Sequence, residues 1–223
     1  MKTLSARIAL LAAAGLLSAC AQHFPPVDYT ADEKASLTEL KAIDDPEAKL
    51  ALGSLLFLHN QIDEADPLLT QAVEAMPKNP QAQAWHAANE CKKAGRRGPW
   101  LMGFDKLWLV HDCLGDVNAA LAAAPDDFVV QMVQMNTGAE VNMFGSLDKA
   151  RATRDAIEAQ RAKQPGMLTG DVAAQYAVTS AKIERVSGNV GKARELLAAA
   201  EQSAPTEATR RLIKAERDLL GGA

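Results

Sequence analysis

Aromatic residues are rare in this sequence, and valine and isoleucine are sparse, whereas alanine is abundant. Phenylalanine, tyrosine and tryptophan together make up 4 % of the 223 residues. Because strands favour β-branched and aromatic side chains while helices favour alanine, this composition argues against a β-sandwich or β-barrel and predicts an all-α protein. Hydrophobic residues still make up 48 % of the chain, which is too high a fraction for a disordered segment.

An excess of positive charge is also missing. The chain has 24 basic and 28 acidic residues and a net charge of −4, so it lacks the positive field with which nucleic-acid-binding proteins attract phosphates. We therefore expect no nucleic-acid partner. The length suits one domain or one array of repeats, and three cysteines are too few for a small domain held together by disulfides.

Sequence motifs of catalysis are absent as well. The chain contains no HExxH, CxxC, GxSxG or phosphate-binding-loop pattern. Pairs of adjacent acidic residues come at the starts of predicted helices, where carboxylates cap free N–H groups: Asp44-Asp45, Asp63-Glu64 and Asp126-Asp127. Because adjacent acids at a helix start do not face each other across a substrate, we predict no enzymatic activity and no cofactor.

The histidines and cysteines do not form a metal site in the predicted helices. The candidates that lie near one another in the sequence are His86, Cys91, His111 and Cys113. Residues two or five positions apart on a helix point to different faces, so neither His–Cys pair can bind one ion together. We expect no metal.

The first apolar run, Ile8 to Leu17, is too short to cross a membrane, and no later segment is long and apolar enough. The run has ten residues, whereas a spanning helix needs roughly 20. Lys2 and Arg7 precede it, and positive charge before a short apolar segment is typical of a secretory signal.

The end of this signal, Leu17-Ser18-Ala19-Cys20, resembles the lipobox of bacterial lipoproteins. The resemblance implies that residues 1–19 are a signal peptide and that Cys20 becomes the acylated first residue of the mature chain, which several acyl chains anchor stably. Ala21 stands where an aspartate is associated with inner-membrane retention, so we predict an outer-membrane lipoprotein that faces the periplasm. The alternative is an ordinary signal that ends near a cysteine.

We predict that residues 20–38 form a lipidated flexible tether. Pro25 and Pro26 stiffen this segment and exclude a helix there. From His23 to Lys34 the chain carries too little apolar surface to pack against a core.

A repeated pattern begins at Pro46. Counted from that residue, small or apolar residues occupy positions seven, eight, twenty, twenty-four and twenty-seven, and a proline occupies position thirty-two: Leu52, Gly53, Ala65, Leu69, Ala72 and Pro77. Small residues at positions eight and twenty let the two helices of a hairpin approach closely, and the proline ends the second helix. This pattern resembles the tetratricopeptide (TPR) repeat.

A second match begins at Ala174. The residues at positions eight, twenty, twenty-four, twenty-seven and thirty-two are Ala181, Ala193, Leu197, Ala200 and Pro205. Thr206 to Leu220 follows as an amphipathic helix that we expect to cap the array.

The middle of the chain fits the pattern less closely. Pro80 starts another helix, and an insertion at Gly95 to Gly103 precedes its partner helix. A third hairpin follows, in which either Pro125 or Ala150 sets the register. We predict that residues 39–220 form an all-α, TPR-like α-solenoid of about four helical hairpins and a C-terminal capping helix.

The resemblance to TPR proteins implies a concave groove lined by the first helix of each hairpin. The positions of that helix predict partner-binding residues: Phe57, Trp85, Met132, Asn136, Lys182 and Arg185. Apolar side chains at one end and two cations at the other suit a peptide with an apolar anchor and an acidic stretch, and the rings of Phe57 and Trp85 are placed to bracket one ligand side chain. The alternative is that the apolar residues pack between neighbouring hairpins.

Cys91 and Cys113 flank the insertion on two helices that a hairpin would bring side by side. Once Cys20 is acylated they are the only other cysteines, and an oxidising periplasm favours a disulfide between them. Two buried free thiols are the alternative. The loop from Gly98 to Phe104 concentrates Trp100, Met102 and Phe104, with Trp108 close behind. It is either an exposed docking or membrane-dipping element or a buried plug.

Together these features predict an outer-membrane-anchored periplasmic TPR scaffold that mediates protein–protein interaction in envelope assembly, secretion or transport. Its expected partners are a periplasmic or outer-membrane protein or peptide and, through the lipid anchor, the membrane. The alternative function is a small-ligand-binding accessory subunit of a periplasmic solute transporter. A carrier of that kind would have an enclosed pocket near Trp100, whereas a scaffold would have an open groove.

Overall fold

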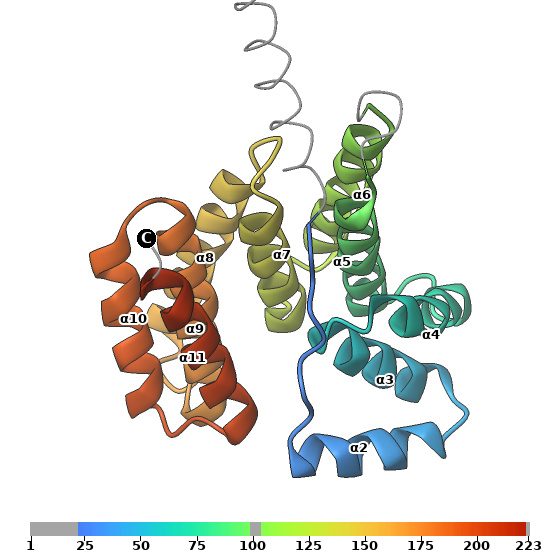
Figure 1. Ribbon diagram of the computed structural model, residues 1–223, viewed down its shortest axis with the longest axis horizontal. Coiled ribbons are helices and arrows are strands. Elements are labelled where there is room, and N and C mark those ends of the chain that lie inside the picture. Colours follow the sequence, from blue (N-terminus) through green and yellow to red (C-terminus); the bar gives the residue numbers. More distant parts are fainter. Residues whose placement is uncertain (1–21, 99–103, 222–223) are drawn as a thin grey trace, which may run out of the picture.

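The computed structural model describes residues 22–98 and 104–221, and within these ranges the chain forms ten helices and no strands (Figure 1). The helices are α2 (Ala31–Lys41), α3 (Pro46–Leu58), α4 (Ile62–Ala75), α5 (Pro80–Arg96), α6 (Phe104–Ala123), α7 (Phe128–Val141), α8 (Ser146–Lys163), α9 (Gly170–Val186), α10 (Val190–Gln202) and α11 (Glu207–Gly221). The predicted all-α class is confirmed.

Neighbouring helices pack as hairpins that follow one another along the chain. The pairs are α3 with α4, α5 with α6, α7 with α8, and α9 with α10, and α11 packs against both helices of the last pair. The first helices of the hairpins contact each other in sequence order, from α3 through α5 and α7 to α9. This arrangement is that of a helical solenoid with four hairpins and a C-terminal cap, as predicted.

The helix starts follow from residues that satisfy free backbone N–H groups. The Asp45 side chain accepts a hydrogen bond of 2.8 Å from the N–H of Ala48, and Asp127 accepts one of 3.1 Å from Val130. Asn79 caps α5 in the same way, and prolines follow Asn79 and Asp45 at the first helical position, where a missing N–H costs nothing. Two of the acidic residues predicted to be caps therefore have that role.

Small residues bring the two helices of a hairpin together at the positions that the repeat predicts. Ala65 and Ala193 are completely buried, and a Cβ atom on Gly53 would lie only 2.8 Å from Leu69. In the third hairpin a Cβ atom on Gly138 would lie 2.6 Å from the carbonyl oxygen of Ser146 and 3.2 Å from the Cβ of Ala150. Ala150 therefore sets the register that the sequence left open.

The predicted flexible tether at residues 20–38 is wrong for the part that the structure describes. Residues 31–41 form α2, whose start is stabilised by a capping box between Thr30 and Glu33. Tyr29, Leu37 and Leu40 pack against the core of the first two hairpins. The prolines only exclude a helix before residue 31, and the apolar side chains beyond them are enough to hold α2 in place.

Cys20 and the predicted signal peptide, residues 1–19, lie outside the described residues. No helix in the described ranges has both the length and the apolarity needed to cross a membrane.

Candidate functional site: an inner groove

A cavity of about 390 Å³ lies on the side of the solenoid formed by the first helices of the hairpins. Five of the six predicted partner-binding residues line it: Phe57, Trp85, Met132, Asn136 and Lys182. They come from α3, α5, α7 and α9, and the cap helix α11 adds Leu212 and Glu216. We call this cavity the inner groove.

The two aromatic residues form the floor of one end of the groove. Phe57 is only 2 % exposed, and its ring lies edge-on to Trp85 with 5.4 Å between the ring centres. Because the rings contact each other directly, they leave no space between them, and the prediction that they bracket a ligand side chain is wrong. Phe57 packs between hairpins, whereas Trp85 is only partly buried and faces the groove.

Of the two cations predicted to bind a partner, only Lys182 lines the groove. Its Nζ donates a hydrogen bond of 2.7 Å to Asn136 Oδ1, which links α9 to α7 across the groove. An amide oxygen carries no full charge, so the positive charge of Lys182 is not neutralised by this partner.

Arg185 has a different role from the predicted one. Its guanidinium donates hydrogen bonds of 2.8 and 3.3 Å to the two carboxylate oxygens of Glu216 in α11. The Glu216 side chain is only 9 % exposed, so this two-point ion pair is well shielded from water. Arg185 therefore fastens the cap helix to α9 and is not among the residues that line the groove.

Lys92 is a groove residue that the sequence analysis missed. Its ammonium group donates hydrogen bonds of 2.7 Å to Asn60 Oδ1 and 3.4 Å to the carbonyl oxygen of Phe57 and lies 4.1 Å from the centre of the Phe57 ring. Burial lowers the pKa of Lys92 to about 8, although nearby Glu140 acts in the opposite direction. The sequence held a signal for it, because Lys92 is the thirteenth residue counted from Pro80, a position that the resemblance to TPR proteins assigns to the concave side.

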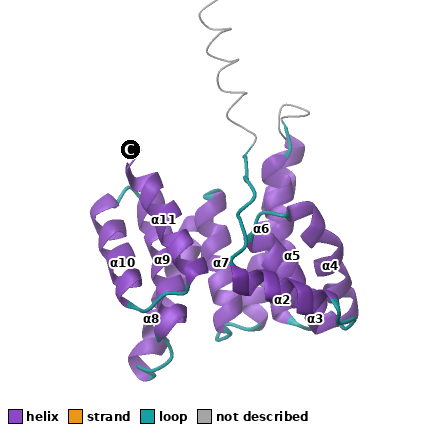
Figure 2. Ribbon diagram, turned by 60° about the horizontal axis from the view of Figure 1, so that its bottom comes forward, coloured by secondary structure: helices purple, strands orange, loops and turns teal. Residues whose placement is uncertain are grey.

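An extended segment, residues 22–30, lies along the same side of the solenoid and reaches α2, where Figure 2 shows it as a teal loop beside α7. We call it the N-terminal strap. Its backbone forms three hydrogen bonds with two parts of the fold, α5 and the turn after α3: Gln22 N–H to Gly95 O at 2.9 Å, Val27 N–H to His59 O at 3.1 Å, and Pro25 O from Asn60 Nδ2 at 2.8 Å. The inner surface thus holds an extended stretch of chain, and Val27 of that stretch forms part of the groove wall.

His59 fixes the far end of the strap. This buried ring is stacked on Tyr29 with 3.8 Å between ring centres. Its Nδ1 lies 2.9 Å from the carbonyl oxygen of Val27, and its Nε2 lies 3.1 Å from Glu33 Oε1. These contacts join residues about thirty positions apart, and no periodic pattern in the sequence predicts them.

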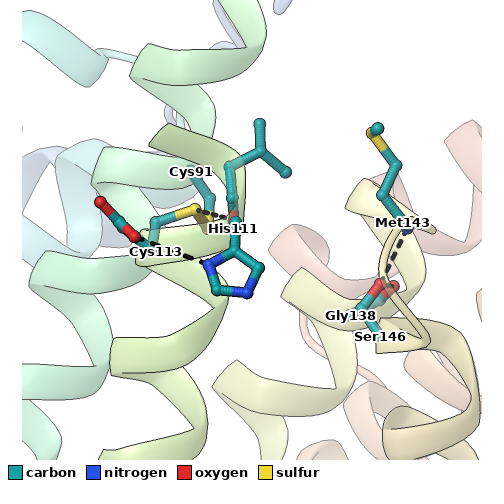
Figure 3. Close-up of a disulfide and its surroundings, with 8 residues drawn as sticks. Cys91, His111, Cys113, Gly138, Met143 and Ser146 are labelled. Atoms are coloured by element: carbon teal, nitrogen blue, oxygen red, sulfur yellow. Dashed lines mark hydrogen bonds and ion pairs between the residues drawn. A yellow bond between two sulfur atoms is a disulfide. The ribbon is translucent and has the colours of Figure 1, made fainter. Parts of the chain in front are cut away.

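Cys91 and Cys113 form a disulfide, with 5.3 Å between their Cα atoms (Figure 3). The bridge joins α5 to α6, as the predicted hairpin allowed. Because the two sulfurs are bonded to each other, neither is free to act as the metal ligand considered above. Within the described residues no three His, Cys, Asp or Glu side chains are grouped closely enough to hold a metal ion. Trp100 lies outside the described residues, whereas Phe104 and Trp108 are exposed on α6.

Comparison with known proteins gives no further assignment. No family model, curated protein or solved structure matches the chain. The groove and the helical solenoid that carries it are therefore the basis on which a function is proposed.

Proposed function

We propose that this protein is a non-catalytic TPR-type scaffold, anchored to the outer membrane through Cys20, that binds an extended segment of a periplasmic or outer-membrane protein in the inner groove. The observation that carries this proposal is the convergence of five predicted residues, from four successive hairpins, on one groove. Side chains that meet from four helices form a continuous surface, and a continuous surface suits a peptide several residues long.

The chemistry of the groove supports an amphipathic segment as ligand. Trp85 and Met132 offer apolar contact surface near one end, and Lys182 offers a positive charge towards the other. Aromatic and methionine side chains contribute strongly to protein–protein contacts, while the cation favours acidic residues and speeds association. The ligand best suited to this surface has a large apolar side chain followed by one or more acidic residues.

The N-terminal strap supports the same binding mode. It is an extended segment held by backbone hydrogen bonds to His59 and Gly95, and it lies next to the groove. A second extended segment could bind beside it with little change in the solenoid, because the helices that form the wall are already packed. Rigid walls reduce the conformational cost of binding.

The experiment compares two valines in equivalent places. Val129 in the first turn of α7 lines the groove and is 36 % exposed; Val172 in the first turn of α9 lies outside the groove lining and is 42 % exposed. An aspartate is tolerated in the first turn of a helix, where it interacts favourably with the helix dipole, so both V129D and V172D should fold. Acylated wild type and both variants are used as bait for crosslinking and capture from bacterial envelope.

The proposal predicts a recurrent protein partner that wild type and V172D capture equally and V129D captures poorly. Equal capture by V129D would show that the partner binds elsewhere and would refute the groove as the site. A small molecule that copurifies with wild type and V172D but not with V129D, with no protein partner, would favour the transporter accessory subunit instead.

A further inference from the structure

The first two turns of α6 present apolar side chains to solvent. Phe104 is 66 % exposed and Trp108 is 70 % exposed, and Leu107 beside them is also exposed. These residues are spaced by three and four positions, so they share one face of the helix. Large aromatic side chains exposed together on one face are uncommon on a surface that contacts only water.

The turn between α7 and α8 extends this apolar face. Met143 and Phe144 are both exposed there, and the Phe144 ring lies edge-on to His111, with 5.5 Å between ring centres. His111 is on the same face of α6 as Trp108, one turn further along. The five exposed apolar residues on α6 and this turn, Phe104, Leu107, Trp108, Met143 and Phe144, are called the apolar face below.

The turn holds Phe144 in an unfavourable backbone conformation. Its φ is +52°, in the left-handed region that is unfavourable for a residue with a side chain. Ser146 stabilises the turn, because its hydroxyl accepts a hydrogen bond of 3.1 Å from the N–H of Met143 and donates one of 2.8 Å to Gly138 O (Figure 3). A large apolar residue is thus kept exposed at a position that glycine or asparagine would occupy with less strain.

The described chain begins at the same edge of the molecule. Gln22 N–H donates to Gly95 O at 2.9 Å, and Lys106 Nζ, from between Phe104 and Trp108, donates to that same oxygen at 3.0 Å. In Figure 1 the beginning of α6 and the α7–α8 turn lie at the upper edge of the domain, and the strap starts below them, in its upper half. Cys20 precedes Gln22 by two residues, which span at most about 7 Å.

We propose that the apolar face lies in the lipid–water interface of the membrane to which Cys20 is anchored, so that the domain rests directly on the bilayer. This inference depends on the lipid anchor of the proposed function. Because residues 22–30 are bound along the solenoid, no long tether separates the acylated cysteine from the domain. Gln22 and Lys106 share Gly95 O as acceptor, so the anchored end of the chain lies beside the first turn of α6, which carries part of the apolar face. Tryptophan and phenylalanine favour the membrane interface, where they leave water without entering the hydrocarbon core.

The described residues at this edge include two cations, Lys106 on α6 and Arg97 just after α5. Lys106 keeps its positive charge, because its partner, Gly95 O, is a neutral carbonyl oxygen. Two cations attract anionic lipid less than a polybasic segment does, so the membrane contact should depend only weakly on anionic lipid.

The test measures whether lipid touches Trp108. The acylated protein is reconstituted into vesicles of phosphatidylcholine, with or without bromine atoms on the acyl chains, which quench tryptophan fluorescence on contact. One variant, Trp85→Phe with Trp100→Phe, keeps Trp108 as its only tryptophan. A matched variant, Trp100→Phe with Trp108→Phe, keeps only Trp85, which faces the inner groove.

We expect brominated lipid to quench Trp108 and to leave Trp85 unquenched. If Trp85→Phe disturbs the fold, the difference in quenching between the wild type and Trp108→Phe gives the same quantity, because Trp108 is exposed and its replacement removes no core contact. Adding Phe104→Glu and Phe144→Asn should reduce the quenching of Trp108, whereas Leu219→Glu, at an exposed leucine of α11, should not.

The outcomes separate this inference from the proposed anchor. Anchored protein in which Trp108 is quenched no more than Trp85 would overturn the membrane contact and leave the anchor standing. Protein that incorporates no labelled palmitate and stays out of the vesicles would overturn the anchor and, with it, this placement of the domain. Protection of Trp108 from a soluble quencher at high protein concentration, without vesicles, would show that a second copy covers the face and would also overturn the inference.

Discussion

The guanidinium of Arg211 donates a hydrogen bond of 2.9 Å to the carbonyl oxygen of Asp28, which precedes it by 183 residues. Asp28 belongs to the N-terminal strap and Arg211 to the cap helix α11, so the two ends of the described chain meet beside the inner groove. At its other contacts the strap is held by His59 and Gly95, in the first and second hairpins. The strap thus connects elements that the order of the repeats keeps apart.

Lowering the pH should weaken the attachment of the N-terminal strap, because Glu33 becomes protonated. Burial alone would raise the pKa of this carboxyl, but hydrogen bonds from the N–H and hydroxyl of Thr30 and from His59 outweigh it, and the pKa lies below its ordinary value. A lowered pKa in the folded state stabilises the fold at neutral pH, and this contribution is lost as pH falls through that lowered pKa, from about pH 4 downward. We expect Glu33→Gln to be less stable than the wild type at pH 7, with the difference shrinking in acid.

The measurement for Glu33 is urea denaturation of both proteins at several pH values, followed by circular dichroism. Limited proteolysis at neutral pH should cut the strap faster in Glu33→Gln. A stability difference that stays constant from pH 7 to pH 3 would contradict the assigned hydrogen bonds of Glu33.

Replacing Gly138 or Gly115 by alanine should change the stability of the protein in opposite directions. A Cβ on Gly138 would lie 2.6 Å from the backbone oxygen of Ser146, whereas one on Gly115, inside α6, would meet nothing within 4 Å. Gly138→Ala should therefore destabilise the protein by about 1–3 kcal/mol through overpacking, and Gly115→Ala should stabilise it by roughly 0.5–1 kcal/mol. Thermal melting of the two variants checks this; equal shifts in one direction would refute the close helix contact.

Reversal of charge should be costly at Arg185 but not at Lys182. Arg185→Glu leaves the nearly buried Glu216 facing a second carboxylate, and loss of one partner of a buried pair costs about 3 kcal/mol or more. Lys182→Glu removes only a hydrogen bond to Asn136 and should cost about 1 kcal/mol. The swap Arg185→Glu with Glu216→Arg should recover part of the lost stability. An unchanged melting temperature for Arg185→Glu alone would show that the Arg185–Glu216 ion pair does not hold α11 in place.

The disulfide should stabilise the second hairpin. It joins residues that are 22 positions apart, and closing a loop of that length stabilises a fold by about 3 kcal/mol. Reducing agent should therefore lower the melting temperature of the wild type. The double variant Cys91→Ala with Cys113→Ala should melt at a similarly low temperature, and reductant should not change that temperature. If complete reduction left the melting temperature of the wild type unchanged, this prediction would be contradicted.

The parts of the fold that could be predicted are those in which sequence spacing determines contact. Positions eight and twenty of a hairpin meet because helix geometry places them opposite each other, so Ala65 and Ala193 could be assigned to the helix contacts in advance. Most residues of the groove could be predicted by counting positions in the same repeat, because residues at equivalent positions in the first helices of successive hairpins lie side by side. Phe57 shows the limit of this reasoning. Its position in the repeat predicted the correct side of the helix, but not that its ring would be almost completely buried between hairpins.

The parts that could not be predicted depend on contacts between distant segments. The strap is held by His59, Gly95 and Arg211, and these residues follow no periodic rule relative to residues 22–30. Arg185 was misjudged for the same reason, because its partner Glu216 lies on a cap helix whose rotation about its own axis is set only by packing. Phe144 required knowledge of the turn conformation, which the Phe144-Gly145 sequence does not specify.

Binding of a protein partner in the inner groove is tested most directly by a site-specific photocrosslink from that groove. The photoreactive residue is placed at Leu212, which lines the groove, or at Leu219, which is exposed on the same helix α11 but does not line it, in the acylated protein in living cells. We expect a discrete crosslinked protein from position 212 that is lost with V129D and absent from position 219. Crosslinks of equal yield from both positions, or from position 219 alone, would contradict the assignment of the inner groove as the binding site.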